Sequence, residues 1–199
     1  GAMAALHGGM VVASDRCELV YRTALPDPMK ALLLVPRLGP RVSSGEDEAQ
    51  ALLTRARALD RRDAARKAYR VLMDLLPAMI QGDATALGDV LWDLTQVGSK
   101  RAECCLHGDG GREIYETMGA LREEGAEIVG MSSVGPAVFA LSARARVWKR
   151  WQSRRESGAP GCALVVPVDN AGARVRLDGT PVPYHLEAWW HEPHGEAFP

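Results

Sequence analysis

The stretch AEIVGMSSVGPAVFAL, from Ala126 to Leu141, decides how the fold of this chain is interpreted. Two apolar runs, Glu127–Met131 and Ala137–Leu141, flank a small, polar centre that contains glycine. Short apolar runs bounded by turn residues are typical of buried strands, so the stretch predicts a strand, a loop and a second strand. The centre is either a tight hairpin or a place where a ligand approaches the backbone closely.

Further strands are predicted on both sides of this hairpin. Met10–Ser14 and Glu18–Leu25 are short and bounded by polar residues, and Lys30–Leu38 is a nearly continuous apolar run. Such a run is typical of a strand that is buried on both faces. Cys162–Val168 is predicted as another buried strand, and Ala173–Leu177 as a further one.

Helical patterns dominate the middle of the chain. Ser43-Ser44-Gly45 offers an N-cap for a helix over Glu46–Leu59, which is acidic at its start and basic at its end. Asp60–Gln81 has apolar residues at spacings of three and four, and Gly82 ends it. Three further helices are predicted, at Ala84–Val97, Arg112–Glu124 and Ser142–Glu156.

The order of strands, helices, two strands, helix and strand indicates the α+β class. We expect one domain over residues 4–178, a small antiparallel sheet with helices on one face. Gly1-Ala2-Met3 resembles a remnant of tag cleavage and is set aside. Lys100–Gly111, with three glycines, and the Pro-, His- and Trp-containing tail 179–199 are expected to be irregular.

Composition excludes several classes of function. The chain has 199 residues, a formal net charge of −1 and 25% charged residues, so it carries no electrostatic footprint for nucleic acid or an anionic membrane. No apolar run approaches the roughly 20 residues of a membrane-spanning helix, and no signal peptide is recognised. The four cysteines show no C-x-x-C spacing. We therefore expect a cytoplasmic protein without disulfides.

The centre of the hairpin is the first candidate site. Successive backbone N–H groups in a glycine-containing turn can form an anion-binding nest, to which serine hydroxyls add donors. The residues concerned are Ser132, Ser133, Gly135 and Pro136. The loop contains no lysine and matches no Walker pattern, so taken alone it is better explained as a hairpin loop that needs small residues.

Two other segments are weaker candidates. Gly8 and Gly9 precede the first predicted strand and could admit a ligand to the backbone, with His7 as an acid or base. A flexible lead-in explains them more simply. Asn170 and Arg174 follow the Cys162–Val168 strand, where a turn is somewhat favoured over a ligand contact.

Basic residues between Arg144 and Arg155 are predicted to form a solvated helix face, with Val147 and Trp151 pointing inward. The histidines of the tail and the Cys104-Cys105 pair with His107 have no metal-binding motif, so no metal site is predicted from them. The tail residues concerned are His185, Glu187, His191, Glu192 and His194.

Taken in order, several segments resemble one protein family. The segments are LHGGMVVAS, KALLLVP, AYRVLMDLLPAMIQGDATALGDVLWDLTQVG, IVGMSSVGPAVFAL and DNAGARV. Together, from about residue 6 to residue 177, they resemble the C-terminal half of β-ribofuranosylaminobenzene 5′-phosphate synthase, a member of the GHMP kinase superfamily. Closely similar enzymes make C-nucleoside antibiotics.

The resemblance implies a ferredoxin-like α/β sandwich of the GHMP kinase C-terminal domain type. It also implies a transferase that joins the anomeric carbon of phosphoribosyl pyrophosphate to a carbon of an aromatic carboxylate acceptor. Carbon dioxide and pyrophosphate are lost, ATP is not used, and Mg²⁺ accompanies the pyrophosphate.

The resemblance also assigns substrate-binding residues but no catalytic ones. The superfamily's C-terminal glycine-rich motif, which faces the inter-domain cleft, corresponds to Ser132, Ser133, Gly135 and Pro136. His7, Gly8 and Gly9 are implied to lie close to the same cleft, and Asn170 and Arg174 are weaker correspondences.

Two departures limit the resemblance. The superfamily's N-terminal domain, with its Pro-x-Gly-Leu-Gly-Ser-Ser type of phosphate loop, has no counterpart here, and Ser43–Gly45 does not replace it. Ala13 stands where a family synthase carries aspartate. We therefore expect a partner that completes the active site, either a second polypeptide with the N-terminal half or another copy. A small-molecule kinase domain and a non-catalytic binding or assembly module remain alternatives.

Overall fold

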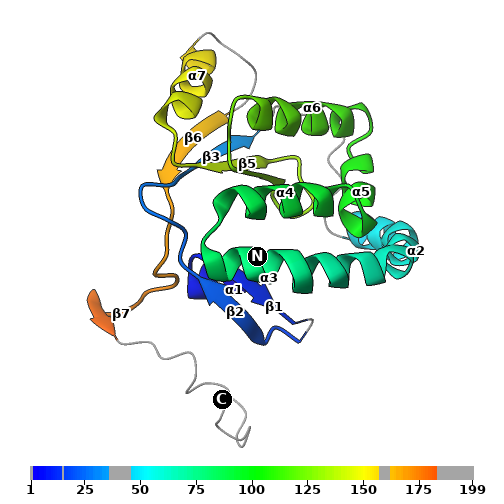
Figure 1. The fold of residues 1–199 in the computed structure, drawn as a ribbon, viewed down its shortest axis with the longest axis horizontal. Helices are drawn as coiled ribbons and strands as arrows, with labels where there is room; N and C mark the ends of the chain where they lie inside the picture. The colour runs from blue at the N-terminus through cyan, green and yellow to red at the C-terminus, as the bar shows by residue number, and fades with distance from the viewer. Residues whose placement is uncertain (1, 15, 36–45, 157–161, 183–199) are drawn as a thin grey trace, which may run out of the picture.

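The computed structural model describes residues 2–14, 16–35, 46–156 and 162–182 (Figure 1). Ser43–Gly45, proposed above as an N-cap, lies outside these ranges. The elements are, in chain order, α1 (Ala2–His7), β1 (Met10–Ala13), β2 (Leu19–Thr23), β3 (Lys30–Val35), α2 (Glu46–Arg70), the π-helical turn η1 (Val71–Leu75), α3 (Leu76–Gln81), α4 (Ala84–Thr95), α5 (Gly98–Cys105), α6 (Asp109–Glu123), β4 (Ile128–Met131), β5 (Val138–Ser142), α7 (Ala145–Glu156), β6 (Cys162–Pro167), β7 (Val175–Leu177) and β8 (Thr180–Val182).

A four-stranded antiparallel sheet, in the order β4-β5-β3-β6, forms the centre of the fold. Along the chain, β3 is followed by helices, the β4–β5 hairpin, α7 and β6. This is the β-α-β-β-α-β arrangement of ferredoxin-like sandwiches. The expected α+β class is therefore confirmed, and so is the hairpin of the opening stretch, in which Met131 pairs with Val138.

Apolar clusters cover both faces of this sheet. Neighbouring residues of a strand point to opposite faces, and all four residues of β4 are buried. Val129 and Met131 belong to a cluster with residues of α6 and α7, whereas Ile128 belongs to a cluster with residues of α3 and α4. Figure 1 shows α6 and α7 on one side of the sheet and α4 on the other. The fold thus differs from the expected sheet with helices on one face, because a strand buried on both faces needs cover on both.

The two helices predicted for residues 46–81 form one uninterrupted helical run through α2, η1 and α3. No glycine or proline occurs at the predicted boundary between Leu59 and Asp60, so nothing in the backbone ends the first helix there. The run ends at Gly82, which adopts φ 68°, and Asp83 then caps α4 by accepting hydrogen bonds from the N–H groups of Thr85 and Ala86.

The segment Lys100–Gly111, expected to be irregular, contains most of α5 and the start of α6. The N-terminus of α5 receives its hydrogen-bond acceptors from α2. The N–H of Gly98 donates to Asp63 Oδ2 and the N–H of Ser99 donates to Asp60 Oδ1, both at 2.9 Å. Because these carboxylates lie more than 30 positions upstream, the local sequence carries little sign of this helix.

The chain ends also differ in part from expectation. α1 begins at Ala2, so two of the residues set aside as a tag remnant are helical. β8 pairs with β7, so a strand follows Gly179 where an irregular tail was expected, and the tail histidines lie outside the described residues. Within the described part of the chain, no helix is both long and apolar enough to cross a membrane.

The basic helix α7 packs as an amphipathic helix. Val147 points inward, as expected, and Trp148 is buried beside it, whereas the side chain of Trp151 lies outside the described residues. On the polar side, Arg150 pairs with Glu124 at 3.2 Å, and Arg144, just before the helix, pairs with Glu127 at 3.5 Å. These two arginines are thus engaged with carboxylates of the same molecule.

Candidate functional site

The loop between β4 and β5 is closed by hydrogen bonds of its own backbone. The N–H of Ser132 donates to the carbonyl of Ala137, and the N–H of Gly135 donates to the carbonyl of Ser132, both at 2.8 Å. Ser133 and Gly135 adopt φ 49° and 87°, in the left-handed region that glycine favours. A Cβ on Gly135 would lie 2.7 Å from Met131 Sδ and 3.0 Å from His107 Nε2, so only glycine fits there without displacement.

This loop presents several polar groups that remain without partners. Ser132 and Ser133 are exposed. No partner among the described residues binds their hydroxyls or the backbone N–H groups of Ser133 and Val134. Two consecutive N–H groups beside two hydroxyls are the donors from which anion-binding nests are built. The loop is therefore chemically suited to hold a phosphate or pyrophosphate oxygen.

A lysine that the sequence of the loop lacks is supplied by α5. Lys100 Nζ lies 2.5 Å from the carbonyl oxygen of Ser133 and 2.7 Å from Glu103 Oε2. His107, just beyond the end of α5, contacts the carbonyl oxygen of Val134 through Nε2 at 2.6 Å. Sequence reasoning missed Lys100 because its segment was expected to be irregular. The spacing of Lys100, Glu103 and His107, which places them on one side of a helix, was the available signal.

The interior behind the loop holds protonated groups rather than nucleophiles. Cys104 is buried, with its Sγ 3.4 Å from Met131 Sδ, and burial raises the pKa of its thiol. Tyr115 donates a hydrogen bond to the carbonyl of Thr95 at 2.9 Å, and burial raises the pKa of its hydroxyl. Neither group ionises near neutral pH, so neither supplies an anionic nucleophile to the loop.

The second predicted group, His7, Gly8 and Gly9, packs against the turn formed by residues 169–172. The N–H of Gly9 donates to the carbonyl of Asp169 at 2.8 Å. A Cβ on Gly8 would lie 2.4 Å from the backbone nitrogen of Gly172. Both glycines adopt positive φ. They allow two backbone segments to approach each other, and in this structure the turn fills the space in which a ligand was expected.

Asn170 uses its side chain to hold the same turn in place. Its Oδ1 accepts the N–H of Leu25 at 2.9 Å, and its Nδ2 donates to the carbonyl of Leu25 at 3.0 Å. Arg22 adds to this connection by donating to the carbonyls of His7 and Asn170. The amide of Asn170 is thus committed to internal bonds that tie the turn to the segment after β2.

Arg174 lies at the exposed side of this turn. Its guanidinium is 3.7 Å from Asp169 Oδ1, and both side chains are mostly exposed. Hydrogen bonds from the N–H groups of Ala171 and Gly172 lower the pKa of Asp169. Among the described residues of the predicted group at positions 7–9, 170 and 174, Arg174 thus has a charged side chain that is largely in solvent.

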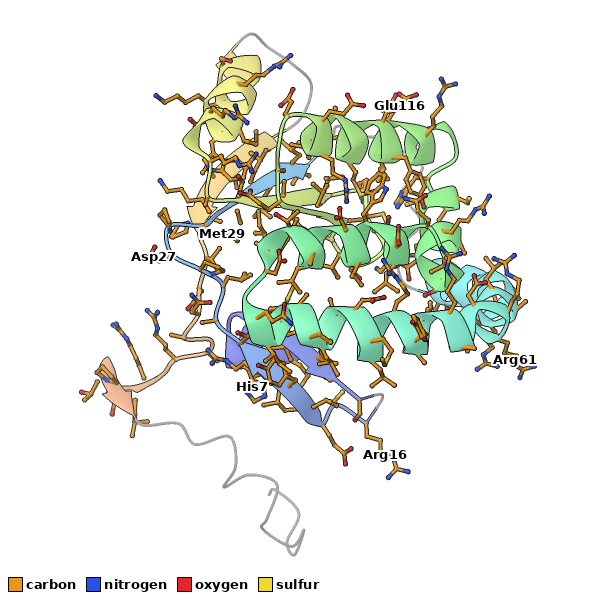
Figure 2. All side chains as sticks on the ribbon, viewed as in Figure 1. His7, Arg16, Asp27, Met29, Arg61 and Glu116 are labelled. Carbon is orange, nitrogen blue, oxygen red and sulfur yellow. The ribbon has the colours of Figure 1, made fainter. Side chains whose placement is uncertain are left out.

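The two predicted groups lie at opposite ends of the sheet. Lys30 of β3 pairs with Ser142 and Pro167 at one end, and the turn at residues 169–172 follows Pro167. The loop at residues 132–136 leads into Val138, which pairs with Leu34 at the other end. The five residues of β5 span about 13 Å from the first Cα to the last, at roughly 3.3 Å per residue. The structure therefore does not bring the two groups together in one small site, and Figure 2 shows His7 beside the β1–β2 pair.

The described residues do not fit a protein-held Mg²⁺. Among them, no three His, Cys, Asp or Glu side chains are grouped so that they could hold a metal ion. At the β4–β5 loop, the carboxylate of Glu103 is paired with Lys100, and its side chain is only 11% exposed. A cation there would have to displace an internal ion pair.

The chain is similar in sequence to two curated proteins. A beta-ribofuranosylphenol 5′-phosphate synthase from Methanothermobacter thermautotrophicus is 29% identical over 124 residues, which are 62% of this chain and 36% of that protein. The protein of the same name from Archaeoglobus fulgidus is 26% identical over 153 residues, covering 68% and 45%. No family model matches the chain. The chain thus spans less than half of the length of these relatives.

Two solved structures resemble the fold. They are a homoserine kinase from Cytophaga hutchinsonii, with a TM-score of 0.52 and 15% identity, and a putative homoserine kinase from Listeria monocytogenes, with a TM-score of 0.50 and 18% identity. Each match covers 85% of this chain and about half of the other, 51% and 52% respectively. The described structure is therefore a GHMP kinase-type α+β fold. Within that class, the sequence is similar to the ribofuranosylphenol phosphate synthases, which confirms the expected resemblance.

Proposed function

We propose that residues 4–178 form the C-terminal domain of a phosphoribosyl-pyrophosphate-dependent C-ribosyltransferase that acts on an aromatic carboxylate with loss of carbon dioxide. The observation that carries this proposal is the anion-binding character of the β4–β5 loop, with Lys100 beside it. It supports this function because the chain is similar in sequence to synthases whose name specifies a ribofuranosyl 5′-phosphate product.

The proposed reaction needs stabilisation of negative charge. The bond between the anomeric carbon and the pyrophosphate oxygen breaks, and pyrophosphate leaves with the electron pair. A π electron pair of the acceptor ring forms the new bond to the anomeric carbon, at the ring carbon that bears the carboxylate. The bond between this ring carbon and the carboxylate then breaks, its electron pair restores the aromatic ring, and carbon dioxide is released. Backbone N–H groups at the leaving group stabilise the charge that develops there, whereas Lys100 is bound to the carbonyl of Ser133 and to Glu103. Since the described residues offer no metal cluster, any Mg²⁺ would be held chiefly by the pyrophosphate.

An exposed apolar stripe supports the proposal that a partner completes this site. Tyr69, Leu72, Met73 and Ile80 are between 59% and 67% exposed along the run from α2 to α3. Their spacings of three, four and seven place them on one side of the helical run. Contiguous exposed apolar surface of this kind marks interaction sites in soluble proteins. We propose that a second polypeptide carrying the N-terminal half covers this stripe, and a second copy of the chain is the alternative.

Isothermal titration calorimetry with phosphoribosyl pyrophosphate and with ATP tests the proposal. The chain is titrated alone and together with a polypeptide that supplies the N-terminal half. We expect heat from phosphoribosyl pyrophosphate and none from ATP when both polypeptides are present. Binding of ATP but not of the ribosyl donor contradicts the proposal.

The alternative of a small-molecule kinase rests on the likeness of the fold to homoserine kinases. ATP binding in the same titration supports that alternative. If neither ligand binds when the partner is present, the result supports a non-catalytic module that has kept the fold.

A further inference from the structure

Two side chains from α5 and its C-terminal end hold consecutive carbonyl groups of the β4–β5 loop. Lys100 donates to the carbonyl of Ser133, and His107 donates through Nε2 to the carbonyl of Val134, since a carbonyl oxygen can only accept. His107 Nδ1 is buried and has no partner in the described structure, so the ring's one hydrogen bond is to the loop. Both contacts connect the α5 segment to the loop, and neither is a hydrogen bond within the helix.

The Lys100 contact determines which way the loop presents the N–H of Val134. In a trans peptide unit the C=O and the following N–H point in opposite directions. The unit between Ser133 and Val134 is trans, because the cis bonds of the described chain precede Pro28 and Pro136. With the carbonyl of Ser133 directed at Lys100, the N–H of Val134 therefore points away from α5. This is one of the two N–H groups of the loop that have no partner.

The N-terminus of α5 is itself anchored to α2. Its first two N–H groups donate to Asp63 and Asp60 of α2, and the Asp63 side chain is only 12% exposed. The helix therefore has a defined position from which Lys100 and His107 reach the loop.

We propose that Lys100 and His107 are positioning residues, which hold the β4–β5 loop by its carbonyls so that the N–H groups of Ser133 and Val134 receive an oxyanion. The ligand class is a phosphate or pyrophosphate group. The identity of this ligand rests on the proposed function, whereas the positioning of the loop can be tested in the free chain.

The test uses the full chain, labelled with ¹⁵N and titrated with inorganic pyrophosphate. In the unsubstituted chain, the amide resonances of Ser133 and Val134 shift on titration. Lys100→Met weakens pyrophosphate binding by about tenfold, the expected effect of losing a charged hydrogen bond. The matched control is Arg101→Met, which removes the same charge from an exposed neighbour and weakens binding by less than about twofold.

The histidine is tested with a conservative pair. His107→Gln keeps an N–H donor near the position of Nε2, whereas His107→Leu removes it. We expect His107→Leu to weaken binding and His107→Gln to restore most of it. If the unsubstituted chain binds pyrophosphate, equal weakening by Lys100→Met and Arg101→Met, or equal binding by the two His107 variants, overturns the positioning role.

A readout in the absence of ligand separates this inference from the proposed function. The amide of Gly135 is hydrogen bonded inside the loop, so its hydrogen exchange reports loop order. Exchange faster in Lys100→Met than in Arg101→Met supports the positioning role even if no pyrophosphate binds, an outcome that contradicts the proposed ligand alone. Unchanged exchange at Gly135 in both Lys100→Met and His107→Leu overturns the positioning role. If Lys100→Met fails to fold, the His107 pair decides.

Discussion

The backbone N–H of Gly98 donates a hydrogen bond to Asp63 Oδ2 at 2.9 Å, so α5 begins on a carboxylate of α2. The two residues are 35 positions apart. Val97, at the N-cap position of α5, supplies no side-chain acceptor of its own. The helix that carries Lys100 therefore depends on a tertiary contact for its N-terminal cap.

Replacement of Asp63 is expected to destabilise the chain. Asp63→Ala leaves the Gly98 N–H without its acceptor and lowers Tm by a few degrees. Asp63→Asn keeps an acceptor oxygen and lowers Tm less. Differential scanning calorimetry compares these variants with Glu116→Ala, whose side chain pairs with Arg112 at an exposed site. A Tm for Asp63→Ala equal to that of the Glu116→Ala control contradicts the role of Asp63.

The same carboxylate predicts a pH dependence. Hydrogen bonds from Arg62 and from the Gly98 N–H lower the pKa of Asp63 from 3.8 to about 2. A lowered pKa in the folded state means that the stabilisation is complete above the unfolded value of 3.8 and is lost as the pH falls towards 2. Urea denaturation should show the stability gap between the unsubstituted chain and Asp63→Asn shrinking over that interval. A gap that is constant from pH 5 to pH 2 would exclude this linkage.

Gly135→Ala is expected to distort the β4–β5 loop. The substitution combines φ 87° with a Cβ 2.7 Å from Met131 Sδ, and the left-handed conformation alone costs about 1 to 2 kcal/mol. Gly119→Ala, in α6, has no atom within 4 Å of the added Cβ and should stabilise by about 0.5 to 1 kcal/mol. Chemical denaturation measures the change in the free energy of unfolding for both variants. A change of the same sign in the two would be inconsistent with the loop geometry.

At Gly8, the steric cost of an added Cβ against the turn at residues 169–172 can be distinguished from the cost of backbone strain. Gly8 and Gly82 adopt φ 66° and 68°, so alanine is equally strained at both. An alanine Cβ at position 82 meets no atom within 4 Å, whereas at position 8 it meets Gly172 N at 2.4 Å. Gly8→Ala should therefore cost more stability than Gly82→Ala in equilibrium unfolding. Equal costs would show that the turn can move away.

The apolar stripe on α2–α3 gives a prediction about assembly. Leu72→Ser and Ile80→Ser should leave the Tm of the isolated chain nearly unchanged, since both side chains are at least 60% exposed. Both substitutions should weaken association with the partner or with a second copy, as measured by analytical ultracentrifugation. Leu53→Ser, at another exposed site of α2, serves as the comparison. Association that is unaffected by Leu72→Ser and Ile80→Ser would show that the stripe is not an interface.

Local signals were sufficient for the hairpin of the opening stretch. The predicted strands at Glu127–Met131 and Ala137–Leu141 agree with β4 and β5 to within one residue at each end. Apolar runs, a Gly-Pro pair and small polar residues lie within 16 positions of one another, so their pattern specifies the turn without help from the rest of the chain. The same locality identified the loop as a candidate anion site.

Contacts between distant segments were not predictable in this way. α5 was missed because its capping carboxylates belong to α2, and with it Lys100 was missed as a neighbour of Ser133. Likewise, His7, Gly8 and Gly9 were expected near the same cleft as Ser133. The pairing of β3 with β5 and β6 instead places them at the other end of the sheet.

The positions of most strands and helices, the β4–β5 hairpin and the donor-rich loop follow from residue patterns, because they depend on neighbours a few positions away along the chain. The pairing of Lys100 and His107 with the loop, the cover on both faces of β4 and the separation of the two candidate groups arise only on folding. They depend on which strands pair and which helix caps which, and these choices are made by burial and hydrogen bonding between segments tens of residues apart.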